Sequence, residues 1–255
     1  YDSVKNSYSL DKVENPEQFY ITAKAFGRFA YDLNDFDASQ LVEVIPQFHD
    51  TRNRYRQLEE AIREDRVGSV KEVQEEIAFI QNRKADCFLL YDLLDEGVLP
   101  LRVTHNDTKL NNIMFDSETK EPLCIVDLDT VMPGLVLFDF GDSIRFGAND
   151  CAEDEPDLSK VNFDFDLYEI YVKGFIEGTN GILTEAELEY LPWGARVITL
   201  EQGIRFLTDY INGDVYYATT RPGQNLDRAR TQLKLVQDME NVWDKMVEAV
   251  KNAQK

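Results

Sequence analysis

Most of the chain has apolar residues at helical spacing, and only one central stretch has the spacing of strands. Asn15-Pro16 predicts the start of a first helix, because Asn caps helices well and Pro is tolerated in the first turn. A buried helix face follows, made by Phe19, Ala23, Phe26, Ala30 and Leu33.

Further helices are predicted on both sides of the central stretch. Gly68 divides the charged helical segment 51–81 in two, and Gly97 fits the end of the next helix. A capping box at Thr184 begins another helix. Met132-Pro133-Gly134 has the composition of a turn. The remaining predicted helices are Phe163–Glu177, Trp193–Ile211 and Asn225–Lys251.

The strand-like stretch lies between Arg102 and Asp129, and we expect strand content only there. Three short strands are predicted, with a polar loop after the first and Asp127 at the end of the third. Side groups at the ends of neighbouring strands can be presented side by side by a rigid scaffold. These features predict a functional site rather than a core. The strands are Val103-Thr104, Ile113–Phe115 and Leu123–Val126.

The polar loop has the residue types and spacing of phosphoryl transfer. His105, Asp107 and Asn112, followed by Asp127, match the catalytic parts of protein kinases. Asp107 can accept or orient the proton of an attacking hydroxyl. Asn112 and Asp127 offer the hard oxygen ligands that Mg²⁺ prefers beside the phosphates of ATP. Lys109 can place positive charge on the transferred phosphoryl group, and His105 is interpreted as structural support.

Other interpretations of this stretch remain open. Asn- and Asp-rich loops are often only solvated turns. Segment 125–131 also resembles the signature of haloacid-dehalogenase phosphatases, with Asp127 as nucleophile and Asp129 as acid/base. That signature begins a doubly wound α/β domain, whereas helical patterns follow it here. A non-catalytic binding module is the third alternative, although the intact Asp107, Asn112 and Asp127 argue against it.

Three segments carry a family resemblance: VTHNDTKLNNIMFD, IVDLDTVMPG and LVLFDFGDSIRFGAN. They resemble the aminoglycoside phosphotransferase/choline kinase family, whose members share the protein-kinase-like fold. Within it, the chain looks most like bacterial N-acetylhexosamine 1-kinases, which phosphorylate the anomeric hydroxyl of N-acetylated amino sugars. The resemblance implies an ATP- and Mg²⁺-dependent kinase of small molecules.

The resemblance also implies residue roles. Asp107 matches the catalytic base, and Asn112 and Asp127 match the two metal-binding positions. Asp139 matches an acid that braces the catalytic loop. Arg205 and Tyr216, in GIRFLTDYINGDVYY, fit the positions that hold the sugar.

The residues alone leave the role of Arg205 open. Arg205 directly follows Ile204 of an apolar stripe, so it points away from the centre of that stripe. It can equally be a surface residue or the partner of Asp209 four positions later.

Length and composition predict one α+β unit. The chain has 255 residues, 43% of them hydrophobic, which supports a real core. We expect a single mainly helical, kinase-like large lobe over residues 1–255. It divides into a helical part (1–100), a catalytic hairpin (101–130) and a helical substrate-side part (131–255).

No phosphate-binding glycine loop and no Val-Ala-Ile-Lys equivalent precedes His105. We therefore expect that Tyr1 follows the hinge, that the nucleotide-binding small lobe is missing, and that this piece alone is inactive.

Charge and cysteine content limit the partners. A net charge of −21 makes nucleic acid and anionic membranes poor partners. No apolar run is long enough to span a membrane. Three cysteines without metal-site spacing fit reduced thiols in the cytoplasm. We expect a small-molecule partner, an amino sugar.

Overall fold

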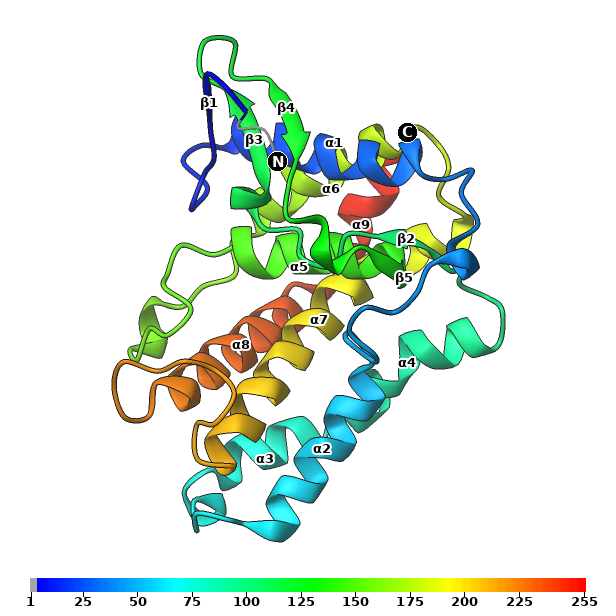
Figure 1. Ribbon diagram of the computed structural model, residues 1–255. Coiled ribbons are helices and arrows are strands. Elements are labelled where there is room, and N and C mark those ends of the chain that lie inside the picture. Colours follow the sequence, from blue (N-terminus) through cyan, green and yellow to red (C-terminus); the bar gives the residue numbers. More distant parts are fainter. Residues whose placement is uncertain (1–3) are drawn as a thin grey trace.

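The computed structural model describes residues 4–255 as helices around two small sheets (Figure 1). The α-helices are α1 (Pro16–Asp32), α2 (Thr51–Glu64), α3 (Gln74–Gln81), α4 (Lys84–Asp95), α5 (Val136–Gly147), α6 (Phe165–Thr179), α7 (Glu185–Ile211), α8 (Gln224–Asn241) and α9 (Trp243–Ala253). The strands are β1 (Ser7–Tyr8), β2 (Arg102–Thr104), β3 (Ile113–Asp116), β4 (Pro122–Ile125) and β5 (Met132–Gly134). Short 3₁₀ turns are η1 (Ala38–Gln40), η2 (Val70–Glu72), η3 (Leu110–Asn112), η4 (Leu128–Thr130) and η5 (Leu158–Lys160).

Several helix boundaries are set by local signals that the sequence shows. The Asn15 side chain accepts a hydrogen bond from the Gln18 backbone at the start of α1. Thr184 and Glu187 form the predicted capping box at the start of α7. Gly97 has positive φ just after the end of α4, and Gly68, also with positive φ, lies in the turn that divides α2 from α3. These predictions are confirmed. The left-handed residue that caps α2 itself is Asp65.

Both sheets are antiparallel. β1, β3 and β4 form one sheet in that order, and β2 pairs with β5 in the other. The doubly wound parallel sheet of a haloacid-dehalogenase phosphatase is therefore absent from residues 4–255, and that alternative is wrong at the level of the fold. No helix in the same residues is both long and apolar enough to cross a membrane.

The expectation that strands occur only between residues 102 and 129 is wrong at two places. Segment 7–8 forms β1 at the edge of the hairpin, and segment 132–134, predicted as a turn, forms β5. Two or three residues show no periodicity, so only their partners make them strands. Gly134 allows the close approach, because a Cβ there would lie 2.4 Å from Thr104 Oγ1.

Two apolar cores are joined by the long helix α7. The first core lies among α1, α5, α6 and α9, and the second among α2, α3, α7 and α8. The first half of α7 packs in the first core through Leu191 and Ala195. Its second half packs in the second core through Ile204 and Leu207. In Figure 1, α7 accordingly runs from the region beside the sheets down to α2 and α3.

Two predicted helix boundaries are wrong. The helices expected to begin at Thr184 and Trp193 are one helix, α7, which continues through Pro192. Burial on both sides of Pro192 offsets its lost hydrogen bond. The last predicted helix, 225–251, is broken at Val242 into α8 and α9. Trp243 then packs on Trp193 at 4.9 Å between ring centroids, which places α9 in the first core.

Candidate active site

Asp139, in the first turn of α5, holds the backbone of the polar loop that follows β2. Its carboxylate accepts hydrogen bonds from the backbone N–H of His105 (2.8 Å) and of Asn106 (2.7 Å). The Thr108 hydroxyl donates to the Asp139 carbonyl oxygen at 2.6 Å. Burial raises the pKa of Asp139, and the nearby His105 and the two N–H donors oppose that rise. The loop is thus fixed to the helix beneath it.

Asn106 gives the loop its sharp turn. Its backbone is left-handed, with φ of 65°, a conformation that Asn tolerates better than most residues. The Asn106 side chain accepts from the Thr104 hydroxyl and donates to the backbone oxygens of Thr104 and Thr130. The Thr130 hydroxyl in turn donates to the His105 carbonyl at 2.7 Å. Because these contacts surround the residue before Asp107, they determine where that carboxylate points.

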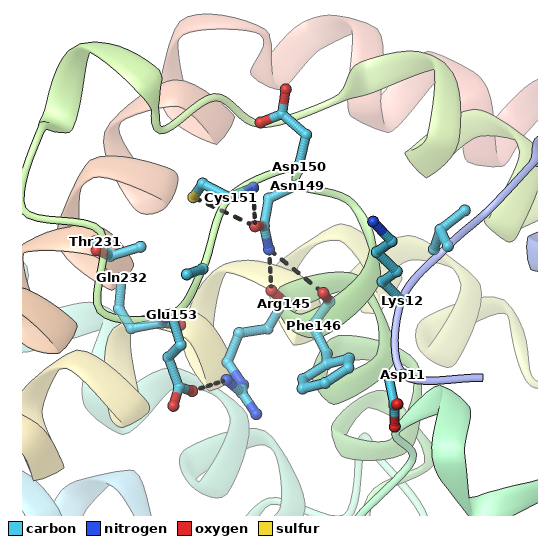
Figure 2. Close-up of a pocket in the computed structure, with 12 residues that line it drawn as sticks. Asp11, Lys12, Arg145, Phe146, Asn149, Asp150, Cys151, Glu153, Thr231 and Gln232 are labelled. Carbon is cyan, nitrogen blue, oxygen red and sulfur yellow. Dashed lines mark hydrogen bonds and ion pairs between the residues drawn. The ribbon is translucent and has the colours of Figure 1, made fainter. Parts of the chain in front are cut away.

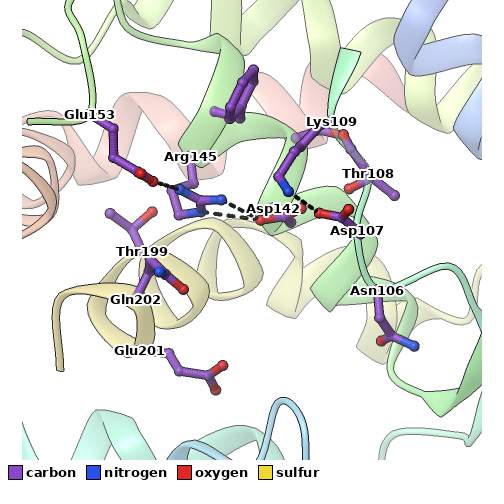
Figure 3. Close-up of polar contacts among 12 residues, drawn as sticks. Asn106, Asp107, Thr108, Lys109, Asp142, Arg145, Glu153, Thr199, Glu201 and Gln202 are labelled. Carbon is purple, nitrogen blue, oxygen red and sulfur yellow. Dashed lines mark hydrogen bonds and ion pairs between the residues drawn. The ribbon is translucent and has the colours of Figure 1, made fainter. Parts of the chain in front are cut away.

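Three of the predicted site residues meet at Asp107. The Lys109 ammonium lies 2.7 Å from Asp107 Oδ1, and Asn112 Nδ2 donates to Asp107 Oδ2 at 3.1 Å. The same Asn112 nitrogen also donates to the Asp107 carbonyl at 2.7 Å. Figure 3 shows Lys109 and Asp107 facing each other close to Asp142 and Arg145. The carboxylate is partly exposed, so a hydroxyl can reach it.

The hairpin brings Asp127 next to Asn112. Ile113 pairs with Ile125 in the β3–β4 ladder, and Val126 N donates to Asn112 O at 2.9 Å just beyond it. Asp127 follows with a left-handed backbone, φ 61°, and an exposed side chain. Because the side-chain nitrogen of Asn112 donates to Asp107, the side-chain oxygen of Asn112 is the atom available to a cation. One amide oxygen and one carboxylate fit Mg²⁺, which takes its other ligands from water and phosphates.

Among residues 4–255, no three His, Cys, Asp or Glu side chains converge as possible metal ligands. With only the two oxygens of Asn112 and Asp127 as protein ligands, a Mg²⁺ ion would take its other ligands from water and nucleotide phosphates.

The buried His105 ring connects the polar loop with the end of β4. Its Nε2 lies 3.0 Å from the Val126 carbonyl oxygen, and its Nδ1 accepts from Asp107 N at 3.3 Å. The ring is fully buried and meets Phe26 and Phe29 edge-on. The contacts tie the loop to the strand end that precedes Asp127.

Comparison with known proteins now places this loop in a family. A sequence profile described as APH, phosphotransferase enzyme family, matches residues 8–169. The chain belongs to the APH phosphotransferase family. The matched residues include the whole site described above, from His105 to Asp142.

Solved structures show the same kinase-like fold. Choline kinase from Cryptosporidium parvum Iowa II is similar with a TM-score of 0.56 and 12% identity, over 98% of this chain and 73% of that one. A choline/ethanolamine kinase family protein from Mesorhizobium loti is similar with a TM-score of 0.51 and 15% identity, again over 98% and 73% of the two chains. At these identities the likeness concerns the fold alone. The chain is thus a mainly helical α+β phosphotransferase with a kinase-like fold.

A buried ion pair of the phosphotransferase lies beside the polar loop that follows β2. Arg145 donates to Asp142 Oδ1 through two nitrogens, at 3.1 and 2.9 Å, and to Glu153 at 2.9 Å. Burial opposes ionisation, but Arg145, with His49 and Lys109, keeps the pKa of Asp142 below its usual value. This carboxylate therefore adds negative charge close to the Lys109 ammonium.

Arg145 also lines a cavity of about 580 Å³ (Figure 2). Lys12, Glu153 and the buried Gln232 lie around the same hollow, between the segment before α1, the loop after α5 and α8. The Gln232 side-chain oxygen has no hydrogen-bond partner among the described residues. The cavity is polar and large enough for a small molecule.

The two residues expected to hold the sugar lie at the far part of α7 and in the loop after it. Arg205 donates to Gln202 at 3.1 Å, and its guanidinium lies 5.6 Å from the Tyr217 ring centroid. Tyr216 is 73% exposed and packs on Tyr217 at 4.8 Å between centroids. Tyr217, rather than Tyr216, therefore contacts Arg205 in this structure.

Asp209 does not pair with Arg205. Its carboxylate instead accepts backbone hydrogen bonds from three successive residues of the loop, Val215 (3.0 Å), Tyr216 (2.8 Å) and Tyr217 (2.9 Å). The alternative of an i,i+4 pair on α7 is thus wrong. Its physical reason is that three backbone N–H groups of one short loop and the Asn225 amide all donate to this carboxylate, whereas Arg205 donates to Gln202.

Sequence reasoning missed several residues of the site. Asn106 and Thr130 hold the loop, and Arg145 pairs with Asp142, but the motif spacing does not mark any of them. The family resemblance placed Tyr216 with Arg205, in a segment that also contains Tyr217. It could not show which ring faces the guanidinium, because that depends on how Asp209 folds the loop.

Proposed function

We propose that this phosphotransferase moves the terminal phosphoryl group of Mg²⁺-bound ATP to a hydroxyl of a small molecule, the anomeric hydroxyl of an N-acetylhexosamine. The supporting observation is the contact set of Asp107, whose carboxylate is held by Lys109 and Asn112 on a loop fixed to Asp139. A carboxylate fixed in this way, partly open to solvent, suits a group that must orient one hydroxyl.

Each residue has a defined task in this reaction. The acceptor oxygen attacks the terminal phosphorus, its proton passes to Asp107, and ADP leaves with the electrons of the broken P–O bond. Lys109 lies close enough to Asp107 to move onto the phosphoryl oxygens as charge shifts there. Asn112 and Asp127 would hold Mg²⁺, which neutralises the phosphate oxygens when bound.

The charges around Arg205 favour a neutral acceptor over a cationic one. Arg54 donates to the Phe48 carbonyl at 2.8 Å, and the Arg205 guanidinium lies 5.4 Å from the Phe48 ring centroid, so both cations lie at the same residue. Burial and the positive charge of Arg205 both lower the pKa of Arg54. Glu201, the acid beside them, is already paired with His49. A choline, ethanolamine or aminoglycoside cation would be repelled here, whereas sugar hydroxyl and acetamide oxygens can accept hydrogen bonds from guanidinium.

A transfer assay with the full-length protein tests the proposal. ATP consumption and phosphorylated product are measured with N-acetylhexosamines, neutral hexoses, choline, ethanolamine and aminoglycosides, and the Asp107→Asn variant is the negative control. We expect product with N-acetylhexosamines that disappears in the variant. Product only with choline or ethanolamine would reject the sugar assignment, and no product with any acceptor would favour a non-catalytic binding module.

A further inference from the structure

His49 lies between the catalytic loop and α7, in the turn before α2. Its ring is 7% exposed, and Phe48 and Phe138 pack on it at 4.5 and 5.4 Å between ring centroids. The Nδ1 atom lies 2.9 Å from Glu201 Oε1 on α7. The Nε2 atom lies 3.2 Å from the carbonyl oxygen of Asn106, the residue before Asp107. The ring therefore connects α7 with the loop that carries the proposed base.

Both neighbours of the ring are hydrogen-bond acceptors. A carbonyl oxygen can only accept, and an ionised carboxylate can only accept. A neutral imidazole has one donor and one acceptor nitrogen, so it can satisfy only one of them. We propose that His49 is held as an imidazolium that donates to Glu201 and to Asn106 at once. These two hydrogen bonds, one to α7 and one to the loop, position Asp107 for phosphoryl transfer.

His105 provides a contrast within the same loop. Its Nε2 faces the Val126 carbonyl, but its Nδ1 faces a donor, the backbone N–H of Asp107. These contacts fit the neutral tautomer with the proton on Nε2. The two histidines of the chain thus have different partners: His49 faces two acceptors, whereas His105 faces one acceptor and one donor.

The surroundings of His49 favour its charge. Burial opposes the charged form, yet Glu201, Asp142 and the Asn106 carbonyl together raise the pKa of His49. Asp139, on the same helix as Asp142, also interacts with His49. Burial alone would raise the pKa of Glu201, but His49, Arg205 and the Thr51 hydroxyl lower it by more, so the pKa of Glu201 lies below its usual value. Thr51 donates to Glu201 Oε2 at 2.6 Å, which leaves Oε1 for the ring.

This arrangement connects the two halves of the proposed site. Arg205 lies one helical turn after Glu201 on α7, whereas Asn106 directly precedes Asp107. A shift of α7 on acceptor binding would thus be transmitted to the catalytic loop through one ring. The effect on turnover rests on the proposed kinase function, but the protonation state of His49 does not.

Nitrogen NMR of the imidazole rings tests the protonation state without any activity. With ¹⁵N-histidine in the chain, the His49→Gln variant identifies which of the two rings is His49. We expect both nitrogens of His49 to carry protons at pH 7 and His105 to show one protonated and one bare nitrogen. The Glu201→Gln variant should abolish the imidazolium pattern of His49. A bare nitrogen on His49 at pH 7 in the unsubstituted protein would overturn the proposal.

Kinetics test the positioning role. Gln at position 49 can donate to only one partner and carries no charge, so His49→Gln should lower kcat about 10-fold or more while the KM for ATP changes less than about 2-fold. The kcat of the unsubstituted enzyme should also fall as the pH rises through the raised pKa of His49, a limb that the variant lacks. An unchanged kcat in a folded His49→Gln variant would refute the positioning role of His49. The same fall of kcat with rising pH in the variant would also refute it.

A matched control and a stability measurement keep the outcomes distinct. Arg63→Ala, on the exposed face of α2, should leave kcat and the His49 pattern unchanged. The pKa of His49 is higher in the folded protein than its unfolded value of about 6.5. The contribution of protonated His49 to the free energy of unfolding is therefore complete below about pH 6.5, and it is lost as the pH rises through the folded pKa. If no acceptor is phosphorylated but His49 is an imidazolium, the proposed function fails and the structural assignment stands.

Discussion

Asp107 shares its carboxylate between a cation and an amide, and this sharing explains how one residue can be both fixed and reactive. Lys109 and Asn112 each contact a different oxygen of Asp107. An acceptor hydroxyl has to displace or join one of these contacts, and its proton then meets a carboxylate whose direction is already set.

Asp107→Asn tests the proposed base. The amide keeps the size of the side chain but cannot take a proton, so kcat should fall by about 10²–10⁴-fold while acceptor binding changes little. Steady-state kinetics and acceptor titration measure the two effects. Asp32→Asn, on the exposed end of α1, is the matched control. An undiminished kcat would discard Asp107 as the base.

Arg205→Ala tests the acceptor side of the site. Removing the guanidinium takes away hydrogen-bond donors near Tyr217 and Gln202 but leaves the catalytic loop intact. The KM for the acceptor should rise about 10-fold and that for ATP less than about 2-fold. An equal rise in both constants would remove Arg205 from the acceptor site.

Among the elements, α7 and the loop after it show how a buried acid organises a functional segment. Asp209, near the end of α7, is 4% exposed and accepts N–H groups from 215–217 as well as the Asn225 amide. The loop that carries the tyrosines is thus bound to the same helix that carries Arg205.

Asp209→Asn tests this link. The variant replaces a charged acceptor with a neutral amide, and hydrogen bonds to charged groups are worth about 1.5–3 kcal/mol. We expect amide hydrogen exchange of residues 215–217 to accelerate about 10-fold or more, with a higher acceptor KM. Asp244→Asn on α9 serves as the control, and unchanged exchange would show that other contacts hold the loop.

At the scale of the whole molecule, one buried ion pair joins parts that lie far apart in the chain. Arg102 of β2 donates to Glu187 of α7 at 2.5 and 2.7 Å, and also to Asn34 and the Ile182 carbonyl. Glu187 is fully buried and completes the capping box of α7. The strand β2, which leads into the loop with the proposed base, is therefore bound to α7, the helix that packs in both cores.

Arg102→Met should destabilise the fold strongly. It leaves the Glu187 carboxylate buried without its cation, which costs about 3–5 kcal/mol in comparable pairs. Urea unfolding measures this loss. The double variant Arg102→Met, Glu187→Met should lose less than the sum of the single variants, since no unpaired charge remains. Strictly additive losses would show that the pair contributes no coupling.

Local patterns in the sequence determined the features that depend on neighbours along the chain. The Asn15 cap, the Thr184 capping box and the 113–125 hairpin follow from propensities and spacing within a few residues. The loop 105–112 and Asp127 were recognisable for the same reason, because phosphoryl transfer requires these groups at nearly fixed spacing. The mainly helical α+β class follows from the same spacing.

Only the tertiary structure decided the features that depend on distant partners. The strand at 132–134 exists because β2 pairs with it, and α7 continues through Pro192 because two cores bury it. The partner of Asp209 and the position of His49 between Glu201 and Asn106 likewise depend on segments that no local pattern connects. Burial and hydrogen-bond satisfaction act through space, so they appear only once the chain is folded.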